Sequence, residues 1–412
     1  SPSSQRLQME FTEKVGLDLC KIHGGEQEIG GNCIELIEGS QRIVLDMGIP
    51  LAAKDPDEVP LPNVPGLLEP DESLLGVLVS HSHLDHYGLL SRVGDHVPIY
   101  MGEATARMIE EAAFFTKMPP PKNISPCLRA RQPLELGPFS ITPYPVDHSA
   151  YESFAFLVDT EDDRLFYTGD IRAHGYKARL MEELLRNPPA GVNKLIIEGT
   201  RVPPNGEQDT HGNMSEEDVV DALVDVFKRT EGLVMVVCSG QNIDRIVSVT
   251  KAANRSNRAI LLDLYASTML QATGNPKVPQ HYRKNTSVFI PQSQRVAVLE
   301  ASEFWRTEAL GADRIYVKDI RRDPSRWVAM VRVSTVRELL KADCLEGSSA
   351  VWSMWPGYLE DTGSGRRFSK LCAENGIPIE VIHSSGHAPA EFLKRFERAI
   401  NAKEVIRVHS LA

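Results

Sequence analysis

The sequence of 412 residues predicts an α/β fold in which a β-rich first domain is interrupted by an inserted domain of alternating strands and helices. Short apolar runs dominate the first two hundred residues and return in the final forty, whereas strand-like runs alternate with helical patterns in between. The chain is also longer than one hydrophobic core usually organises. We therefore predict that residues 1–205 and 376–412 form the first domain and that residues 206–375 form the insertion, built on a parallel sheet.

Four β-rich segments of the first part end in a polar side chain. They cover residues 42–48, 74–83, 164–170 and 194–200, and their terminal polar residues are Asp46, the cluster that begins at His81, Asp170 and Glu198. Loops held by a rigid sheet usually carry function, and purely structural strands have no need of carboxylates at their ends. The sequence therefore indicates that the polar chemistry gathers at strand ends.

Residues 215–230 have the pattern of an amphipathic helix. Ser215 and Asp218 form a capping box at its start. Apolar side chains recur at helical spacing on one face, namely Val220, Leu223, Val224 and Phe227. We expect an amphipathic helix here and another helix over residues 103–115.

Composition excludes several classes of protein. The chain carries 45 basic and 56 acidic residues, a net charge of −11, so it lacks the overall positive charge of a protein that coats nucleic acid. Its six cysteines include no Cys-x-x-Cys pair, which favours a reducing, cytoplasmic location over a disulfide framework or a cysteine zinc site. No apolar run approaches the roughly 18 residues of a membrane span, and the first residues lack the pattern of a signal peptide, so no membrane partner is expected.

Residues 81–86 have the sequence His-Ser-His-Leu-Asp-His and directly follow an apolar strand. Alternate residues of an extended segment point the same way, so His81 and His83 can bind one metal ion. Asp85 and His86, beyond the turn, can bind a second ion. This segment therefore predicts half of a two-metal site, and a solvated histidine-rich turn is the alternative.

Three later residues can complete the two ion sites. His148 is the expected third ligand of the first ion, and His409, after the last strand, completes the second. Asp170 can bridge the two ions, because a carboxylate has two oxygens and offsets the repulsion between cations. Asp46 is expected to accept a hydrogen bond from a ligand imidazole and so fix its tautomer, and a turn or helix cap is its alternative role.

A strand followed by His-Ser-His-Leu-Asp-His, with His148, Asp170 and a terminal histidine, resembles the metallo-β-lactamase fold. That fold is an αββα sandwich with a two-metal site at the sheet edges, and the resemblance covers the first 200 residues and the tail. Later motifs are similar to the β-CASP branch, in which an α/β domain is inserted into the sandwich. They are Glu198 at a strand end, His-Ser-Ser-Gly-His-Ala at 383–388 and Val-His-Ser at 408–410, with His409 following His387 by 22 residues.

Within that branch, residues 238–246 (Cys-Ser-Gly-Gln-Asn-Ile-Asp-Arg-Ile) and 383–388 are most similar to the bacterial and archaeal RNase J group. The resemblance implies a hydrolase that cleaves RNA phosphodiester bonds with two divalent ions, zinc first and manganese as the alternative. Some members degrade RNA from a 5′-monophosphate end. Members normally carry a further C-terminal domain through which they oligomerise, whereas three residues follow His409 here. The sequence therefore leaves open whether the protein forms a homo-oligomer.

The resemblance also assigns roles around the metal site. Water held by two cations has a pKa near 7 and would supply hydroxide as the nucleophile. His387 would give a proton to the leaving 3′-oxygen, Glu198 would hydrogen-bond His387 and raise its pKa, and Asp170 completes the catalytic set.

Five polar side chains are candidates for binding a substrate phosphate: His383, Ser385, Ser239, Gln241 and Asn242. For the last three, an ordinary strand-to-helix turn is the alternative. Trp352, Trp355 and Tyr358 can either stack on bases or pack in the core.

Two other functions stay open. The metal core alone does not choose the substrate, so a related hydrolase acting on DNA or on a small phosphodiester is one alternative. An RNA-binding subunit without catalytic activity is the other. The presence of all seven candidate metal ligands favours an enzyme.

Overall fold

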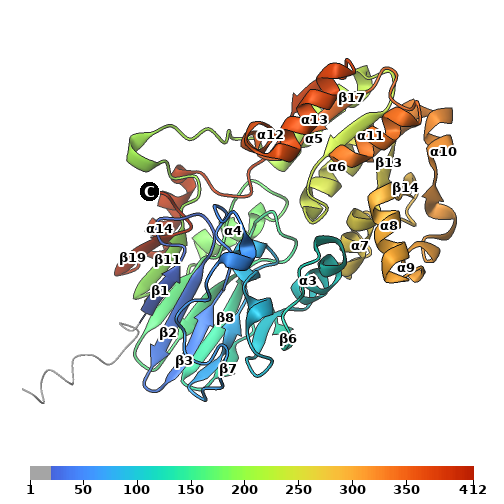
Figure 1. Cartoon of the computed structure of the whole chain (residues 1–412). Helices are drawn as coiled ribbons and strands as arrows, with labels where there is room; N and C mark the ends of the chain where they lie inside the picture. The colour runs from blue at the N-terminus through green and yellow to red at the C-terminus, as the bar shows by residue number, and fades with distance from the viewer. Residues whose placement is uncertain (1–19) are drawn as a thin grey trace, which may run out of the picture.

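A computed structural model describes residues 20–412, so the part of the predicted first domain before residue 20 lies outside the described residues. Two six-stranded sheets form one half of the molecule (Figure 1). The first has the order β1 (Cys20–Gly24), β2 (Cys33–Glu38), β3 (Gln41–Leu45), β4 (Leu74–Leu78), β5 (Ile99–Gly102) and β6 (Ile124–Leu128). The second has the order β19 (Glu404–Val408), β11 (Lys194–Glu198), β10 (Arg164–Tyr167), β9 (Phe154–Asp159), β8 (Phe139–Pro145) and β7 (Leu134–Leu136).

Helices cover the outer faces of these two sheets, and we call this half the sandwich. Helix α3 (Glu103–Thr116) packs outside the first sheet, and α4 (Ala178–Arg186) and α14 (Ala390–Ile400) pack outside the second. Apolar side chains of both sheets, such as Leu36 and Phe156, are fully buried between them. The αββα arrangement that the resemblance implies is therefore confirmed.

A seven-stranded, all-parallel sheet forms the other half, which we call the parallel unit (Figure 1). Its order is β15 (Arg314–Ile315), β14 (Thr286–Phe289), β13 (Ala259–Leu262), β16 (Trp327–Met330), β12 (Val234–Val237), β17 (Ser349–Trp352) and β18 (Ile379–Val381). Strand β18 lies after residue 375, where the sequence predicts the first domain to resume.

Helices cover both faces of the parallel sheet. One face carries α5 (Glu216–Arg229), α6 (Ile243–Arg255) and α7 (Leu264–Ala272), and the other carries α11 (Val333–Lys341) and α13 (Gly363–Glu374). The remaining helices are α2 (Leu84–Tyr87), α8 (Gln292–Ala301), α9 (Trp305–Glu308), α10 (Val317–Arg322) and α12 (Pro356–Asp361). Among residues 20–412, none of the helices is both long and apolar enough to cross a bilayer.

The predicted capping box at the start of α5 is confirmed. Asp218 N–H donates to Ser215 Oγ at 3.1 Å, and Ser215 N–H donates to Asp218 Oδ2 at 2.9 Å. The predicted apolar face packs toward the parallel sheet, where Val220, Leu223 and Phe227 are buried and Val224 is half-buried.

Strand β19 pairs in parallel with β11, although the whole parallel unit lies between them in the chain (Figure 1). Glu198, the last residue of β11, is opposite Val408, the last residue of β19. Strand β10 is parallel to β11, and in the first sheet β3 is parallel to β4. Because the carboxyl ends of neighbouring parallel strands lie at the same edge of a sheet, the residues that follow these strands gather there.

Candidate metal centre

Two groups of side chains converge at this edge. One consists of His81, His83, His148 and Asp170, and the other of Asp85, His86, Asp170 and His409, with one ligand atom per residue and all such atoms in a group within 4.8 Å of one another. Asp170 belongs to both groups. The structure thus brings together all seven residues that the sequence predicts as metal ligands.

One oxygen of Asp170 is the common point of both groups. Asp170 Oδ2 lies 2.9 Å from His86 Nε2 and 3.6 Å from the Nε2 atoms of His81, His148 and His409. Four imidazole nitrogens therefore surround a single buried carboxylate oxygen. This arrangement fits a carboxylate that bridges two cations.

Helix α2 turns the chain between the two groups. His83 is the N-cap of α2, and Asp85 and His86 lie on its single turn. Gly48, in the loop after β3, packs against this turn, because a Cβ at Gly48 would lie 1.7 Å from the carbonyl oxygen of Asp85. The Gly48 position therefore tolerates no side chain while α2 keeps its place.

Asp46 is fully buried beneath the histidines, where its carboxylate accepts several hydrogen bonds. Asp46 Oδ2 lies 2.9 Å from His86 Nδ1 and 2.8 Å from Ser80 Oγ, and Tyr167 Oη donates to it at 2.6 Å. Ser80 Oγ in turn lies 2.9 Å from His81 Nδ1. Since the carboxylate only accepts, Nδ1 of His86 donates to Asp46, and this bond turns Nε2 toward the centre as the atom that would bind a cation.

Two other imidazoles are oriented in the same way. His148 Nδ1 lies 2.5 Å from the carbonyl oxygen of Gly386, which can only accept, so Nε2 of His148 keeps its lone pair. His409 Nδ1 is bonded to Thr200 Oγ1 at 2.5 Å. These partners orient the ligands toward the centre. The sequence gives little sign of them beyond their positions next to the predicted strand ends.

The donor set fits metal ions by two tests. Among the described residues, His81 Nε2 and Asp170 Oδ1 are buried atoms without a hydrogen-bond partner, a costly state that a cation would relieve. Burial also lowers the pKa of His83 to about 3 and the pKa of His148 well below its usual value. Both imidazoles are therefore neutral, which is the form that binds metals.

Glu198 and His387 lie beside this donor set. Glu198 Oε1 accepts from His387 Nδ1 and from the N–H of Ile171, each at 3.0 Å, and Oε2 accepts from the N–H of Thr200 at 3.0 Å. The Glu198 side chain is fully buried, whereas His387 is 20% exposed. Burial lowers the pKa of His387, but the carboxylates of Glu198 and Asp170 outweigh it and raise the pKa to about 9.

The candidate phosphate-binding residues already have partners within the protein. His383 Nδ1 accepts from Arg245 Nη1 at 3.1 Å, and Ser385 Oγ accepts from the N–H of His387 at 3.1 Å. The other three lie in the turn between β12 and α6. There Ser239 Oγ accepts from the N–H of Gln241, Gln241 Nε2 donates to Tyr265 Oη, and Asn242 Oδ1 accepts from the N–H of Arg245 as the N-cap of α6.

The three aromatic candidates divide between core and surface. Trp352 is 2% exposed and packs in the parallel unit. Trp355 is half-buried and stacks on His211 with ring centroids 5.9 Å apart, and Tyr358 meets Trp355 edge-on. The sequence alone does not point to His211, because a lone histidine in a loop gives no periodic or motif signal.

Part of the chain matches a known protein family. Residues 41–237 match the model of the β-lactamase superfamily domain. A crystal structure of a protein of unknown function from Enterococcus faecalis V583 has the same fold, with a TM-score of 0.78, 21% identity, and coverage of 95% of this chain and 94% of that one.

Curated relatives extend the similarity over most of the chain. Ribonuclease J of Sinorhizobium meliloti is 25% identical over 94% of this chain and 68% of its own length. Ribonuclease J of Mycolicibacterium smegmatis is 24% identical over 94% of this chain and 67% of its own length, and Ribonuclease J 2 of Staphylococcus saprophyticus is 24% identical over 58% and 43%. The chain thus spans at most about two thirds of these relatives. Over residues 41–237 the chain is therefore similar to the β-lactamase superfamily domain, and over most of its length it is similar to these RNase J proteins.

Proposed function

We propose that this protein hydrolyses phosphodiester bonds of RNA with two divalent cations. The observation that carries the proposal is the convergence of six candidate ligand side chains on a seventh, Asp170, beside a Glu198–His387 pair that is not among the seven. The names of the curated relatives support RNA as the substrate. Zinc is the proposed ion, since imidazole and carboxylate donors suit it, and manganese is the alternative.

Bound cations would lower the pKa of water and neutralise charge on a scissile phosphate. The protein's own part is to hold donors and a proton in place. His387 is proposed to give its Nε2 proton to the leaving 3′-oxygen, while Glu198 holds the Nδ1 proton and keeps the imidazolium charged. Asp170 also contributes to the raised pKa of His387, and a cation on Asp170 would offset that contribution, so Glu198 is the partner that matters in the loaded enzyme.

Replacing His387 by alanine is expected to lower kcat for RNA cleavage by about 10²- to 10⁴-fold, because the leaving oxygen loses its proton donor. Metal content should stay at the wild-type value, as measured by elemental analysis. His281→Ala is the matched control, since His281 also pairs with a carboxylate, Asp313, at 2.8 Å, but does so away from the centre. Unchanged kcat in the His387 variant would exclude this residue as the proton donor.

A base-stacking surface beside the centre forms the next part of the proposal. Asp209 Oδ1 lies 2.9 Å from His211 Nδ1, and Asp209 Oδ2 accepts from Arg201 Nε at 2.9 Å. Arg201 Nη1 donates to the carbonyl oxygen of His387 at 3.3 Å. This chain of contacts connects the His211–Trp355 stack to the loop of the proposed proton donor, and aromatic faces bind RNA bases without sequence preference.

Replacing Trp355 by alanine is accordingly expected to raise KM for RNA by roughly 5-fold or more while kcat changes little, since base stacking is worth about 1–3 kcal/mol. Trp305→Ala is the control, because Trp305 is 57% exposed on α9. Helix α9 lies between β14 and β15 in the chain, and these strands are at the opposite edge of the parallel sheet from β17 and β18 (Figure 1). Steady-state kinetics on a short single-stranded RNA measures both. An equal effect of the two substitutions would contradict a specific stacking role.

The decisive experiment compares RNA and DNA of the same sequence, each end-labelled and carrying a 5′-monophosphate or a 5′-hydroxyl. We expect cleavage of RNA that chelator abolishes and added zinc or manganese restores. Faster cleavage of 5′-monophosphate RNA would support a phosphate site at His383, Ser385, Ser239, Gln241 and Asn242, and equal rates would remove it. Preferred cleavage of DNA would contradict the proposed substrate.

The proposal extends to the setting in which the protein works. The six cysteines are all free in the structure, which supports a reducing, cytoplasmic location. Assembly into a homo-oligomer remains a prediction, and light scattering of the purified chain tests it.

A further inference from the structure

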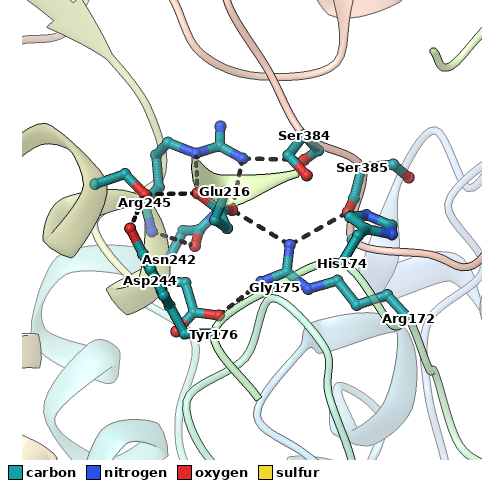
Figure 2. Close-up of polar contacts among 12 residues, drawn as sticks. Arg172, His174, Gly175, Tyr176, Glu216, Asn242, Asp244, Arg245, Ser384 and Ser385 are labelled. Atoms are coloured by element: carbon teal, nitrogen blue, oxygen red, sulfur yellow. Dashed lines mark hydrogen bonds and ion pairs between the residues drawn. The ribbon is translucent and has the colours of Figure 1, made fainter. Parts of the chain in front are cut away.

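Two buried arginines from different halves of the molecule meet around one carboxylate (Figure 2). Arg172 lies in the loop after β10 of the sandwich and Arg245 in the first turn of α6, and neither side chain is exposed. Glu216 Oε1, at the start of α5, accepts from Arg172 Nη1 at 3.2 Å and from Arg245 Nη2 at 3.0 Å. Asp147 and Asp244 accept from the remaining nitrogens of Arg172 at 3.1 and 2.6 Å. This buried ion network joins the sandwich to the parallel unit.

The chain returns from the parallel unit past this network, in a segment that we call the return loop (residues 382–388). Side chains from both halves hold the loop by its backbone carbonyl oxygens. The donors are Ser353 to Ile382 (2.7 Å), Arg245 to Ser384 (3.0 Å), Arg172 and His174 to Ser385 (3.3 and 2.7 Å), His148 to Gly386 (2.5 Å) and Arg201 to His387 (3.3 Å). The path of the loop is therefore set by groups outside it.

Ser385 is the point at which these contacts reach the proposed proton donor. Its carbonyl oxygen accepts from His174 Nε2 and Arg172 Nη1, and its Oγ accepts from the N–H of His387. Figure 2 shows Arg172 and His174 approaching Ser385 from the same side. A shift of Ser385 would therefore carry His387 with it, away from Glu198. Misplacing a reacting group by about 1 Å can cost on the order of 10²-fold in rate.

We propose that Arg172 and His174 are positioning residues for His387 and act through the carbonyl group of Ser385. The proposal rests on the proposed function, in which His387 is the proton donor. Arg172 is also part of the ion network between the sandwich and the parallel unit. Its replacement would disrupt that network, so a loss of activity could not be attributed to the contact with Ser385 alone. His174 makes the shortest bond to Ser385 and takes no part in the ion pairs, so it is the residue to test.

His174→Ala is expected to lower kcat for RNA by about 10- to 100-fold, the usual effect of losing an outer hydrogen-bond partner of a functional group. KM, metal content and melting temperature should stay near wild type. His174→Gln should restore most of kcat, because its amide can donate to the same carbonyl oxygen. The control is His96→Ala, since His96 Nε2 bonds the carbonyl oxygen of Gly66 at 2.8 Å elsewhere in the sandwich. Equal kcat losses in the His174 and His96 alanine variants would overturn the proposal.

A measurement without RNA separates this proposal from the proposed function. In protein labelled with ¹⁵N-histidine, the Nδ1 signal of His387, assigned by its loss in His387→Ala, reports the hydrogen bond to Glu198. His174→Ala should shift that signal and His174→Gln should return it toward wild type, whereas His96→Ala should leave it in place. An unmoved signal in His174→Ala would overturn the positioning role. If the wild-type protein cleaved no RNA, the proposed function would be contradicted. The Nδ1 signal would still show whether His174 positions His387.

Discussion

Asp170→Ala is expected to reduce RNA cleavage by at least about 10³-fold, which corresponds to a loss of about 4 kcal/mol of transition-state stabilisation. The effect is large because Asp170 Oδ2 faces the Nε2 atoms of His81, His86, His148 and His409 together. Removing it takes a candidate ligand from both groups, and two bound cations would lose the negative charge that offsets their repulsion. The bound metal should fall from two equivalents per chain to one or fewer, as measured by elemental analysis after zinc loading.

Asp159→Ala is the matched control for this experiment. Asp159 ends β9 in the same sheet and forms an ion pair with Arg164 at 2.6 Å, but its side chain is 29% exposed and lies outside both groups. We expect this variant to keep full activity and two equivalents of zinc. Full cleavage by Asp170→Ala, with the fold intact by circular dichroism, would contradict the two-cation mechanism.

Glu216→Gln is expected to destabilise the protein by about 3–5 kcal/mol, because it leaves two buried arginines without their shared carboxylate. The contact between the sandwich and the parallel unit should be lost first, since Glu216 links α5 and α6 to the loop after β10. Urea unfolding followed by tryptophan fluorescence measures the change. Glu217→Gln, the next residue of the same helix, is the control, because its ion pair with Lys251 is exposed and worth at most about 1 kcal/mol.

The same pair of variants predicts how stability depends on pH. Burial favours the neutral form of Glu216, but Arg245 and Arg172 outweigh it and lower the pKa to about 2 from a usual value of 4.5. A lowered folded-state pKa means that the stabilisation is complete above about pH 4.5 and is lost as the pH falls toward about 2. The difference in unfolding free energy between wild type and Glu216→Gln should therefore shrink over that range. A constant difference would show that the Glu216 charge contributes nothing.

The residues of the candidate metal centre could be predicted from the sequence because their chemistry is local. His81 to His86 follow an apolar strand as one motif, and Asp170 ends another strand in a polar turn. Parallel pairing then brings such strand ends together, as the alignment of Glu198 with Val408 shows. Two observations are therefore enough to find the residues without knowledge of the packing. The side chains follow the ends of strands, and histidine and aspartate are residue types that bind metal ions.

The residues that hold those ligands could not be found in the same way. Gly386 contributes a carbonyl group, which every residue has, and His174 and Arg172 act on another carbonyl group. Such contacts depend on where the backbone of the return loop passes, which no residue pattern records. For the same reason the sequence could not tell that Trp352 packs in the core while Trp355 lies half-buried against His211.

The pairing of β11 with β19 has a consequence for how the protein is made. During synthesis, β11 leaves the ribosome long before β19, with the whole parallel unit produced in between. Until then the second sheet ends in an unpaired β11 edge, and unpaired strand edges invite aggregation. His409, supplied just after β19, is also missing from the candidate cation site until then. We therefore expect nascent chains that end before β19 to expose the β11 edge and to hold an incomplete candidate cation site.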